Sequence, residues 1–180
     1  MREIFLIRHA DSALDPDVPS EKWGLTSEGV KQARAAGEEL ADAGLVEVFC
    51  SKEPKARRTA DLIAETVGLR SRDMAALGEH RRDSWGFLGD DEFKQAVRDV
   101  LEVPGESIIG AETGRRAAHR FSGAIAAADK KSPPGPIALV SHGTVMSLFM
   151  SQLNGEPAVP MWESMGFAQV FRIEWEAPVE

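Results

Sequence analysis

The sequence predicts an α/β fold, a three-layer sandwich in which helices flank a mainly parallel central sheet. Short apolar runs alternate along the chain with longer stretches of helical spacing, which is the pattern of repeated strand–helix–strand units. The first run is mostly apolar, as expected for a strand whose two faces are both covered by helices. With 180 residues, the chain is expected to form one domain, residues 1–180, around a single core.

The first expected strand covers residues 3–7 and stops at the charged cluster 8–11, which a polar loop follows. A helix is expected over residues 25–43, because Thr26 or Ser27 can cap its first turn. The later elements follow from the same apolar runs, helical spacing and breaker residues. In chain order they are a strand at 45–50, a helix at 54–67, an extended segment at 69–77, helices at 90–101 and 111–129, a strand at 137–140, a helix at 144–153 and a closing strand at 167–175.

Polar residues follow three of the expected strands, at positions 8–9, 51–55 and 141–142. In open parallel sheets, ligands bind beyond the carboxyl ends of the strands. If these strands are neighbours, two histidines and at least two cations meet at one edge of the sheet. This edge is therefore the expected functional site.

The amino-acid composition argues against several classes of binding partner. The chain has 21 Lys and Arg against 29 Asp and Glu, a net charge of -8, which argues against a nucleic acid, since phosphate backbones need a basic face. The single cysteine, Cys50, cannot form an internal disulfide, and no cysteine cluster indicates zinc. No apolar run is long enough for a transmembrane helix or a signal peptide, so we expect a cytoplasmic protein without membrane contact.

Four residues at the strand ends suit phosphoryl transfer, namely Arg8, His9, Lys55 and His142. Arginine offers a planar fork that matches phosphate oxygens, and lysine offers a point charge. A neutral imidazole can attack phosphorus and hold the group covalently, while a second histidine, if protonated, adds a donor. Gly143 opens a helix, whose N-terminus can face an anion. This scheme needs no metal and no cofactor.

The nucleophile must present an unprotonated ring nitrogen. Nearby cations lower the pKa of a histidine, which favours the neutral ring. We therefore expect the opposite ring nitrogen to donate its proton to a backbone carbonyl, which selects the tautomer.

The segment Leu6-Ile7-Arg8-His9-Ala10 resembles the Arg-His signature of the histidine phosphatase superfamily, the phosphoglycerate mutase-like proteins. Four further segments resemble that family in the same order along the chain. They are Leu25-Thr26-Ser27-Glu28-Gly29-Val30-Lys31-Gln32-Ala33, Ser51-Lys52-Glu53-Pro54-Lys55-Ala56-Arg57-Arg58-Thr59-Ala60, Leu77-Gly78-Glu79 and Val140-Ser141-His142-Gly143. The ordered set covers nearly the whole chain and is far more specific than one Arg-His pair.

The resemblance implies a role for each matching position. His9 is the expected phosphorylated residue, and Arg8 and His142 are expected to bind the phosphoryl oxygens. Glu79 is the expected acid for the leaving oxygen and then the base that activates water, so its pKa is expected to be raised. Because Glu79 begins a charged run, His80 and Asp83 are rival candidates for the acid.

The chain departs from the family pattern in two places. The second family arginine falls on Lys55, while Arg57 and Arg58 lie two and three positions out of register. The residues after His9 read Ala-Asp-Ser in place of Gly-Glu-Thr, and the asparagine-rich stretch of mutases and sugar phosphatases is missing. The second departure favours the small phosphohistidine-phosphatase branch.

The expected function is a metal-independent phosphatase that hydrolyses a phosphomonoester or phosphohistidine through a phosphohistidine on His9. Its partner is then a phosphorylated small molecule or a phosphoprotein. The alternatives are a phosphomutase of the same family and a non-catalytic relative that binds a phosphorylated ligand. An insertion at 80–110 is expected to cover the active site, where Trp85 and Phe87 either line the substrate pocket or form a small satellite core.

Overall fold

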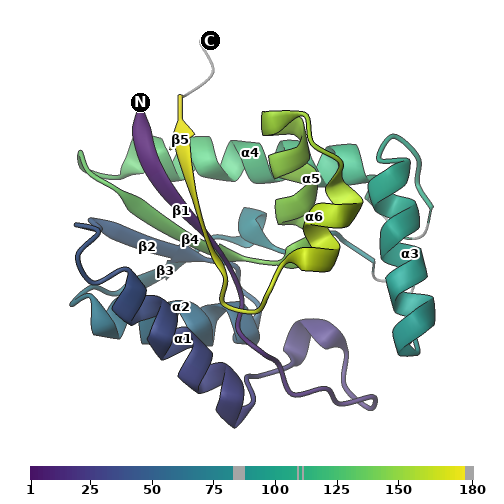
Figure 1. Cartoon of the computed structure of the whole chain (residues 1–180), viewed down its shortest axis with the longest axis horizontal. Helices are drawn as coiled ribbons and strands as arrows, with labels where there is room; N and C mark the ends of the chain where they lie inside the picture. Colours follow the sequence, from purple (N-terminus) through teal and green to yellow (C-terminus); the bar gives the residue numbers. More distant parts are fainter. Residues whose placement is uncertain (83–87, 109, 111, 177–180) are drawn as a thin grey trace.

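The computed structural model describes residues 1–82, 88–108, 110 and 112–176. Figure 1 shows a central sheet with helices on both of its faces. In chain order the elements are β1 (Arg2–Arg8), η1 (Ser20–Lys22), α1 (Ser27–Glu39), β2 (Glu47–Cys50), α2 (Pro54–Thr66), β3 (Ser71–Asp73), η2 (Ala75–Leu77), α3 (Asp90–Glu102), α4 (Gly114–Lys131), β4 (Ile137–Ser141), α5 (Gly143–Asn154), α6 (Ala158–Ser164) and β5 (Val170–Trp175).

The five strands form one sheet in the order β3-β2-β4-β1-β5. The pairs β1–β4, β2–β4 and β2–β3 are parallel, and the edge strand β5 runs antiparallel to β1. The prediction of a mainly parallel sheet between helical layers is confirmed. Because β1 and β2 both lie beside β4, the carboxyl ends of three strands share one edge.

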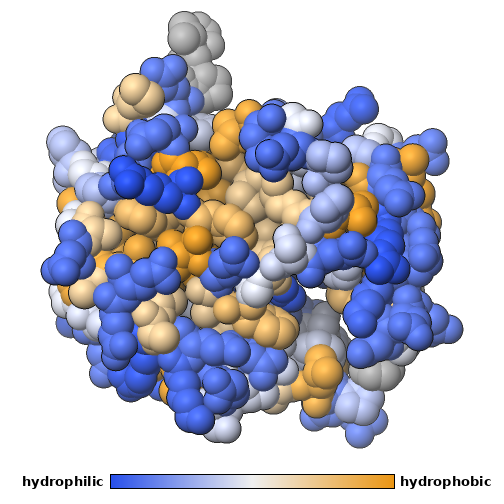
Figure 2. All heavy atoms as spheres, in the orientation of Figure 1, coloured by the Kyte–Doolittle hydropathy of each residue, from blue (hydrophilic) through white to orange (hydrophobic). Residues whose placement is uncertain are grey.

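Alternate residues of the strands enter two separate cores. Ile4 and Leu6 of β1 pack on the side of α3, α4 and α5, whereas Phe5 and Ile7 pack on the side of α1 and α2. Both faces of β1 are therefore buried, which explains why its sequence is apolar without alternation. Figure 2 shows one face of the molecule, where hydrophobic residues gather over the region crossed by β1 and β5 and hydrophilic ones surround them.

Most expected elements are present with shifts at their ends. The helix capped by Thr26 ends at Glu39, four residues before the expected position, and the last turns lie outside the helix. The extended segment 69–77 contains only a short strand, β3, and the 3-10 turn η2. Helix α6 was not expected from the sequence. It has seven residues with Pro160 inside it, so it is too short for a helical period to show.

Among the described residues, none of the helices is both long enough and apolar enough to cross a membrane.

Candidate active site

The two histidines meet where β1 and β4 end. In the parallel pairing of these strands, Arg8 lies opposite Ser141, so the next residues, His9 and His142, leave the sheet side by side. Their ring centroids are 5.2 Å apart. The backbone N–H of His9 donates to the Ser141 carbonyl over 2.8 Å, which ties the first residue after β1 to the end of β4.

The orientation of the His9 ring suits a nucleophile. Its Nδ1 lies 2.8 Å from the Ala10 carbonyl oxygen, which can only accept, so this nitrogen carries the proton. Burial, followed by His142 and Lys55, lowers the pKa of His9 well below its usual value, so the ring is neutral. The lone pair therefore resides on Nε2. This is the tautomer that was expected for attack on phosphorus.

Lys55 is the buried cation of the 51–60 segment, with 6% of its surface exposed. Its Nζ donates to the Ser20 carbonyl oxygen over 2.6 Å and lies 2.9 Å from Oε2 of Glu53. Arg57 is half exposed and pairs with Asp73 on β3, 2.9 Å away. The structure therefore brings Lys55, and not its arginine neighbour, into the group around the histidines, as the register of the sequence predicts.

Arg8, the last residue of β1, is held beside His9 by two contacts. Its Nη1 donates to the Met165 carbonyl oxygen, and its guanidinium lies 4.3 Å from the centre of the Phe167 ring. The same ring lies 5.9 Å from that of His9 and is 40% exposed. An aromatic ring thus covers part of Arg8 at the edge of the site.

His142 caps the N-terminus of α5 and is almost fully buried. Burial lowers its pKa to about 3, because the charges of Lys55, Arg82 and Arg120 add to burial and outweigh Glu79. The ring is therefore neutral at physiological pH. In the expected phosphoryl-transfer scheme, His142 can then donate to a phosphoryl oxygen through one imidazole N–H. Gly143 follows His142 as the first residue of α5, so its backbone N–H lies at the N-terminus of that helix.

Glu79 reaches the same helix terminus. Its carboxylate accepts the N–H groups of Val145 at 2.9 Å and Thr144 at 3.2 Å, and lies 3.2 Å from Arg82. Burial alone would raise the pKa of this carboxyl, but Arg82, His142 and the backbone donors hold it well below its usual range. The raised pKa expected from the sequence is therefore wrong for the unliganded site, because its partners could not be seen in the sequence.

The rival acids are placed differently. His80 is buried with Nε2 2.7 Å from the Glu112 carbonyl oxygen, so its ring bonds to the start of α4. Asp83, Trp85 and Phe87 lie outside the described residues. Of the described part of the insertion, α3 packs against α5 and α6, and its coverage of the site stays a prediction.

Glu53 is a site residue that sequence reasoning missed. Its Oε1 lies 3.2 Å from His142 Nε2 and accepts the Glu79 N–H, while its Oε2 contacts Lys55. The position precedes Pro54 at the start of α2, where an acidic residue is ordinary at a helix N-terminus. Its place within the strand-end segment 51–55 was the one available signal.

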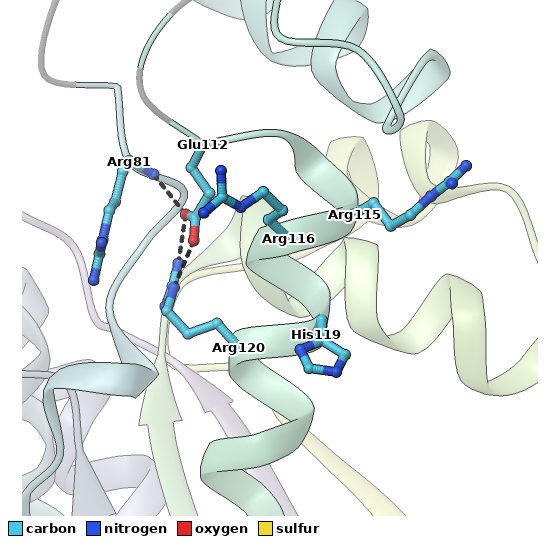
Figure 3. Close-up of a pocket in the computed structure, with 6 residues that line it drawn as sticks. All are labelled: Arg81, Glu112, Arg115, Arg116, His119 and Arg120. Carbon is cyan, nitrogen blue, oxygen red and sulfur yellow. Dashed lines mark hydrogen bonds and ion pairs between the residues drawn. The ribbon is translucent and has the colours of Figure 1, made fainter.

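Arg120 of α4 forms hydrogen bonds that hold the segment that carries Glu79. Arg120 forms two bonds of 2.8 Å with the Glu112 carboxylate and donates to the carbonyls of Ala76, Gly78 and Glu79 at 2.8 to 3.0 Å. Glu112 in turn accepts the Arg81 N–H. Figure 3 shows this clasp in a pocket of about 450 Å³, where Arg81 and Arg115 point away from Glu112. The clasp holds the backbone of the candidate acid.

The variant Arg120→Lys is expected to lower the free energy of unfolding by about 2 kcal/mol, because one ammonium cannot replace five N–H donors at part-buried acceptors. Urea unfolding measures the change. The matched control is Arg116→Lys, an exposed position on the same helix, where a change within about 0.5 kcal/mol is expected. Equal losses in the two variants would contradict a clamp at Arg120.

Stability is expected to fall as pH drops below 6.5. The folded pKa of His142 is about 3 against 6.5 in the unfolded chain, so below pH 6.5 the unfolded chain binds a proton that the folded chain does not. Between pH 6.5 and 5 this linkage costs about 2 kcal/mol for His142, and the lowered pKa of His9 acts in the same direction. Glu79 contributes only below its unfolded value of 4.5.

Urea unfolding at pH 7.5 and pH 5 tests this expectation. The variant His142→Asn should lose about 2 kcal/mol less than the parent chain between the two pH values. A parent chain of equal stability at both would show that the histidines are not buried in neutral form.

Across the described ranges, no group of three or more His, Cys, Asp or Glu side chains is arranged to hold a metal ion.

Comparison with known proteins relates this geometry to a family. Among curated proteins, the chain is 28% identical over 169 residues to a probable phosphoglycerate mutase GpmB of Klebsiella pneumoniae, covering 88% of this chain and 77% of the relative. The corresponding protein of Erwinia tasmaniensis is 27% identical over 173 residues, with the same shares covered.

Solved structures share the fold at low identity. Bacillus stearothermophilus YhfR superposes with a TM-score of 0.79 at 19% identity, covering 98% of this chain and 92% of that one. A mycobacterial glucosyl-3-phosphoglycerate phosphatase gives 0.76 at 22% identity, covering 95% and 89%. A phosphoserine phosphatase mutant from Entamoeba histolytica gives 0.76 at 15% identity, covering 96% and 90%.

The model of one family matches residues 4–178, which include all of the sheet except the first two residues of β1, and both strand-end histidines. The chain belongs to the histidine phosphatase superfamily, branch 1.

Proposed function

We propose that the chain is a phosphatase that acts without a metal ion and passes the phosphoryl group through His9. The observation that carries the proposal is the state of the His9 ring. It is neutral, its Nδ1 proton is held by the Ala10 carbonyl, and its Nε2 carries the lone pair. The ring lies 5.2 Å from that of His142 and within electrostatic reach of Lys55 and Arg8. A neutral imidazole among phosphate-binding groups is the arrangement that nucleophilic attack on phosphorus requires.

In the first step, the Nε2 lone pair forms a bond to phosphorus as the bond to the leaving oxygen breaks. Arg8, Lys55, one His142 N–H and the Gly143 N–H stabilise the phosphoryl oxygens. Glu79 supplies the proton that the leaving oxygen takes up. In the second step, Glu79 removes a proton from water, the water oxygen bonds to phosphorus, and the P–N bond breaks to restore neutral His9 and release phosphate.

The state of Glu79 favours one class of substrate. Because its pKa is held low in the unliganded site, few molecules have this carboxyl protonated at neutral pH. A leaving group that departs without full protonation is then favoured in the first step, whereas the ionised carboxylate is ready for the second. This favours activated phosphoryl donors, phosphohistidine among them, over simple phosphomonoesters whose leaving group needs a proton. It also supports placing the chain in the small phosphohistidine-phosphatase branch.

The phosphatase and the mutase differ in the second acceptor. The relatives are named as phosphatases and as probable phosphoglycerate mutases, so both outcomes need a test. The altered residues after His9, Ala-Asp-Ser, favour water as the acceptor.

The deciding experiment is to trap the intermediate. The protein is mixed with a phosphorus-labelled phosphomonoester in the presence of a chelator, quenched in alkali, and examined for alkali-stable, acid-labile phosphate on His9. The label is expected in the parent chain and in the control His119→Ala, which lacks an exposed histidine of α4. It is expected to be lost in His9→Asn.

The other outcomes identify the alternatives. Slow release to water with fast transfer to a second phosphate acceptor would establish the mutase. Phosphate binding without label or hydrolysis, in folded protein, would establish the non-catalytic relative.

A further inference from the structure

Glu53 places a negative charge among the groups that are expected to bind phosphate. Its carboxylate contacts Lys55 Nζ at 2.9 Å through one oxygen and His142 Nε2 at 3.2 Å through the other. The side chain is mostly buried, with 17% of its surface exposed. The neutral state of His142 makes the second contact one between a carboxylate and an uncharged ring.

The position of Glu53 is fixed from several sides. Its Oε1 also accepts the N–H of Glu79, and its own N–H lies 3.3 Å from the Ser51 hydroxyl. Pro54 follows it at the first position of α2. The carboxylate therefore cannot leave the site without giving up the hydrogen bond from Glu79 and the ion pair with Lys55.

The charges around the histidines are close to balance. Among the described residues, positive charge comes from Arg8, Lys55, Arg82 and Arg120, and negative charge comes from Glu53, Glu79 and Glu112, the last of which pairs with Arg120. The charge of Lys55 is largely offset by its contact with Glu53. A phosphoryl group can still use Arg8, the helix N-terminus and the remaining donor of Lys55. A further anionic group beside it would lie near the Glu53 carboxylate, whose partner Lys55 is already paired, and would be repelled by it.

We propose that Glu53 is a specificity-determining residue that admits phosphomonoesters with a neutral or cationic leaving group and rejects those with a carboxylate or second phosphate beside the phosphoryl group. The selection works by repulsion, which discriminates between ligands as effectively as added contacts do. This inference deepens the proposed phosphatase function and rests on it.

The test compares three esters of similar size that differ in charge. They are phosphoethanolamine, glycerol 2-phosphate and 3-phosphoglycerate, with cationic, neutral and anionic leaving groups. In the parent chain, kcat/KM for 3-phosphoglycerate is expected to lie at least about tenfold below that for glycerol 2-phosphate. In Glu53→Gln this gap should close, chiefly through a lower KM for 3-phosphoglycerate.

The matched control is Glu65→Gln, which removes one charge at the far end of the same helix, where Glu65 pairs with Arg34 on the surface. Its preference among the three esters is expected to equal that of the parent chain. A similar shift in both variants would assign the effect to net charge and overturn the role of Glu53.

A second measurement does not depend on turnover. Inorganic phosphate is titrated into the folded parent chain and into Glu53→Gln, where binding about tenfold tighter is expected. Tighter binding without any hydrolysis would sustain Glu53 as the source of repulsion and overturn the phosphatase. Hydrolysis with an unchanged ester preference and unchanged phosphate affinity would overturn the inference and leave the phosphatase standing. Absence of phosphate binding in both proteins would overturn both.

Discussion

The variant His9→Asn is expected to lower kcat for an aryl phosphate by about 10,000-fold or more, because it removes the protein atom that forms a bond to phosphorus in the proposed mechanism. Asparagine can still donate to the Ala10 carbonyl, which now accepts from the ring. It has no basic nitrogen to take the place of Nε2. Steady-state hydrolysis measured over a range of substrate concentrations gives kcat and KM separately.

The loss should fall on kcat and not on KM. Arg8 and Lys55 are held by their own contacts, to Met165 and to Ser20, and none of these passes through the His9 ring. Affinity for inorganic phosphate should therefore stay within about threefold of the parent chain. Because His9 is buried, its variant is first shown to be folded by urea unfolding.

The control for this prediction is His119→Asn, since His119 is exposed on α4. It is expected to keep full activity. If His9→Asn retained more than a tenth of the parent kcat, the nucleophile would have to be another residue. The tautomer of His9 would then have no role in catalysis.

The sequence predicted the site best where chain direction alone decides position. Parallel strands end at a common edge, so the polar residues after β1 and β4 were expected to meet if the two strands were neighbours, and β1 does pair with β4. His9 and His142 were found in this way, and the register of the 51–60 segment placed Lys55 correctly at the site. These predictions depend on the backbone, which hydrophobic patterning encodes.

The properties that depend on side-chain partners could not be predicted. Glu79 lies far in sequence from the N–H groups of Thr144 and Val145 that lower its pKa. Nothing in the run that begins with Glu79 indicates this contact, and the expected role of Glu79 as the leaving-group acid suggested a raised pKa instead. Glu53 was missed for the same reason, because its contact with His142 crosses from one strand end to another. The sign of a pKa shift is a property of the assembled site.

The short helix α6 limited the fold prediction in a similar way. Pro157 precedes α6 and Pro160 lies in its first turn, where a missing N–H breaks no helical bond. This short helix packs on α5 and sets the path of the chain to Met165, whose carbonyl holds Arg8. An element that periodicity could not detect therefore positions a phosphate-binding residue.

The variant Glu79→Gln is expected to slow the first turnover of an alkyl phosphate by about 100- to 1,000-fold, whereas an aryl phosphate should lose less than about tenfold in that step. An alkoxide leaving group needs the proton that glutamine cannot supply, and an aryl oxide does not. Rapid-quench measurement of the first turnover separates this step from the release of phosphate.

The second step, hydrolysis of the phosphohistidine, should also be slowed in Glu79→Gln. Hydrolysis of the phosphohistidine needs a base, and the low pKa of Glu79 shows that the carboxylate is the form already present in the unliganded site. In Glu79→Gln, an aryl phosphate should therefore give a burst of product followed by slow turnover, with phosphate accumulating on His9. The parent chain should show no comparable accumulation.

The rival acid supplies the control. His80→Asn is expected to leave the ratio of alkyl to aryl rates unchanged, because the His80 ring bonds to the Glu112 carbonyl. If Glu79→Gln slowed both esters equally in the first turnover, while His80→Asn changed the ratio, the acid would have to be reassigned. If neither variant changed the ratio, the substrate's own proton would have to serve the leaving group, and Glu79 would act only as the base that its present charge state favours.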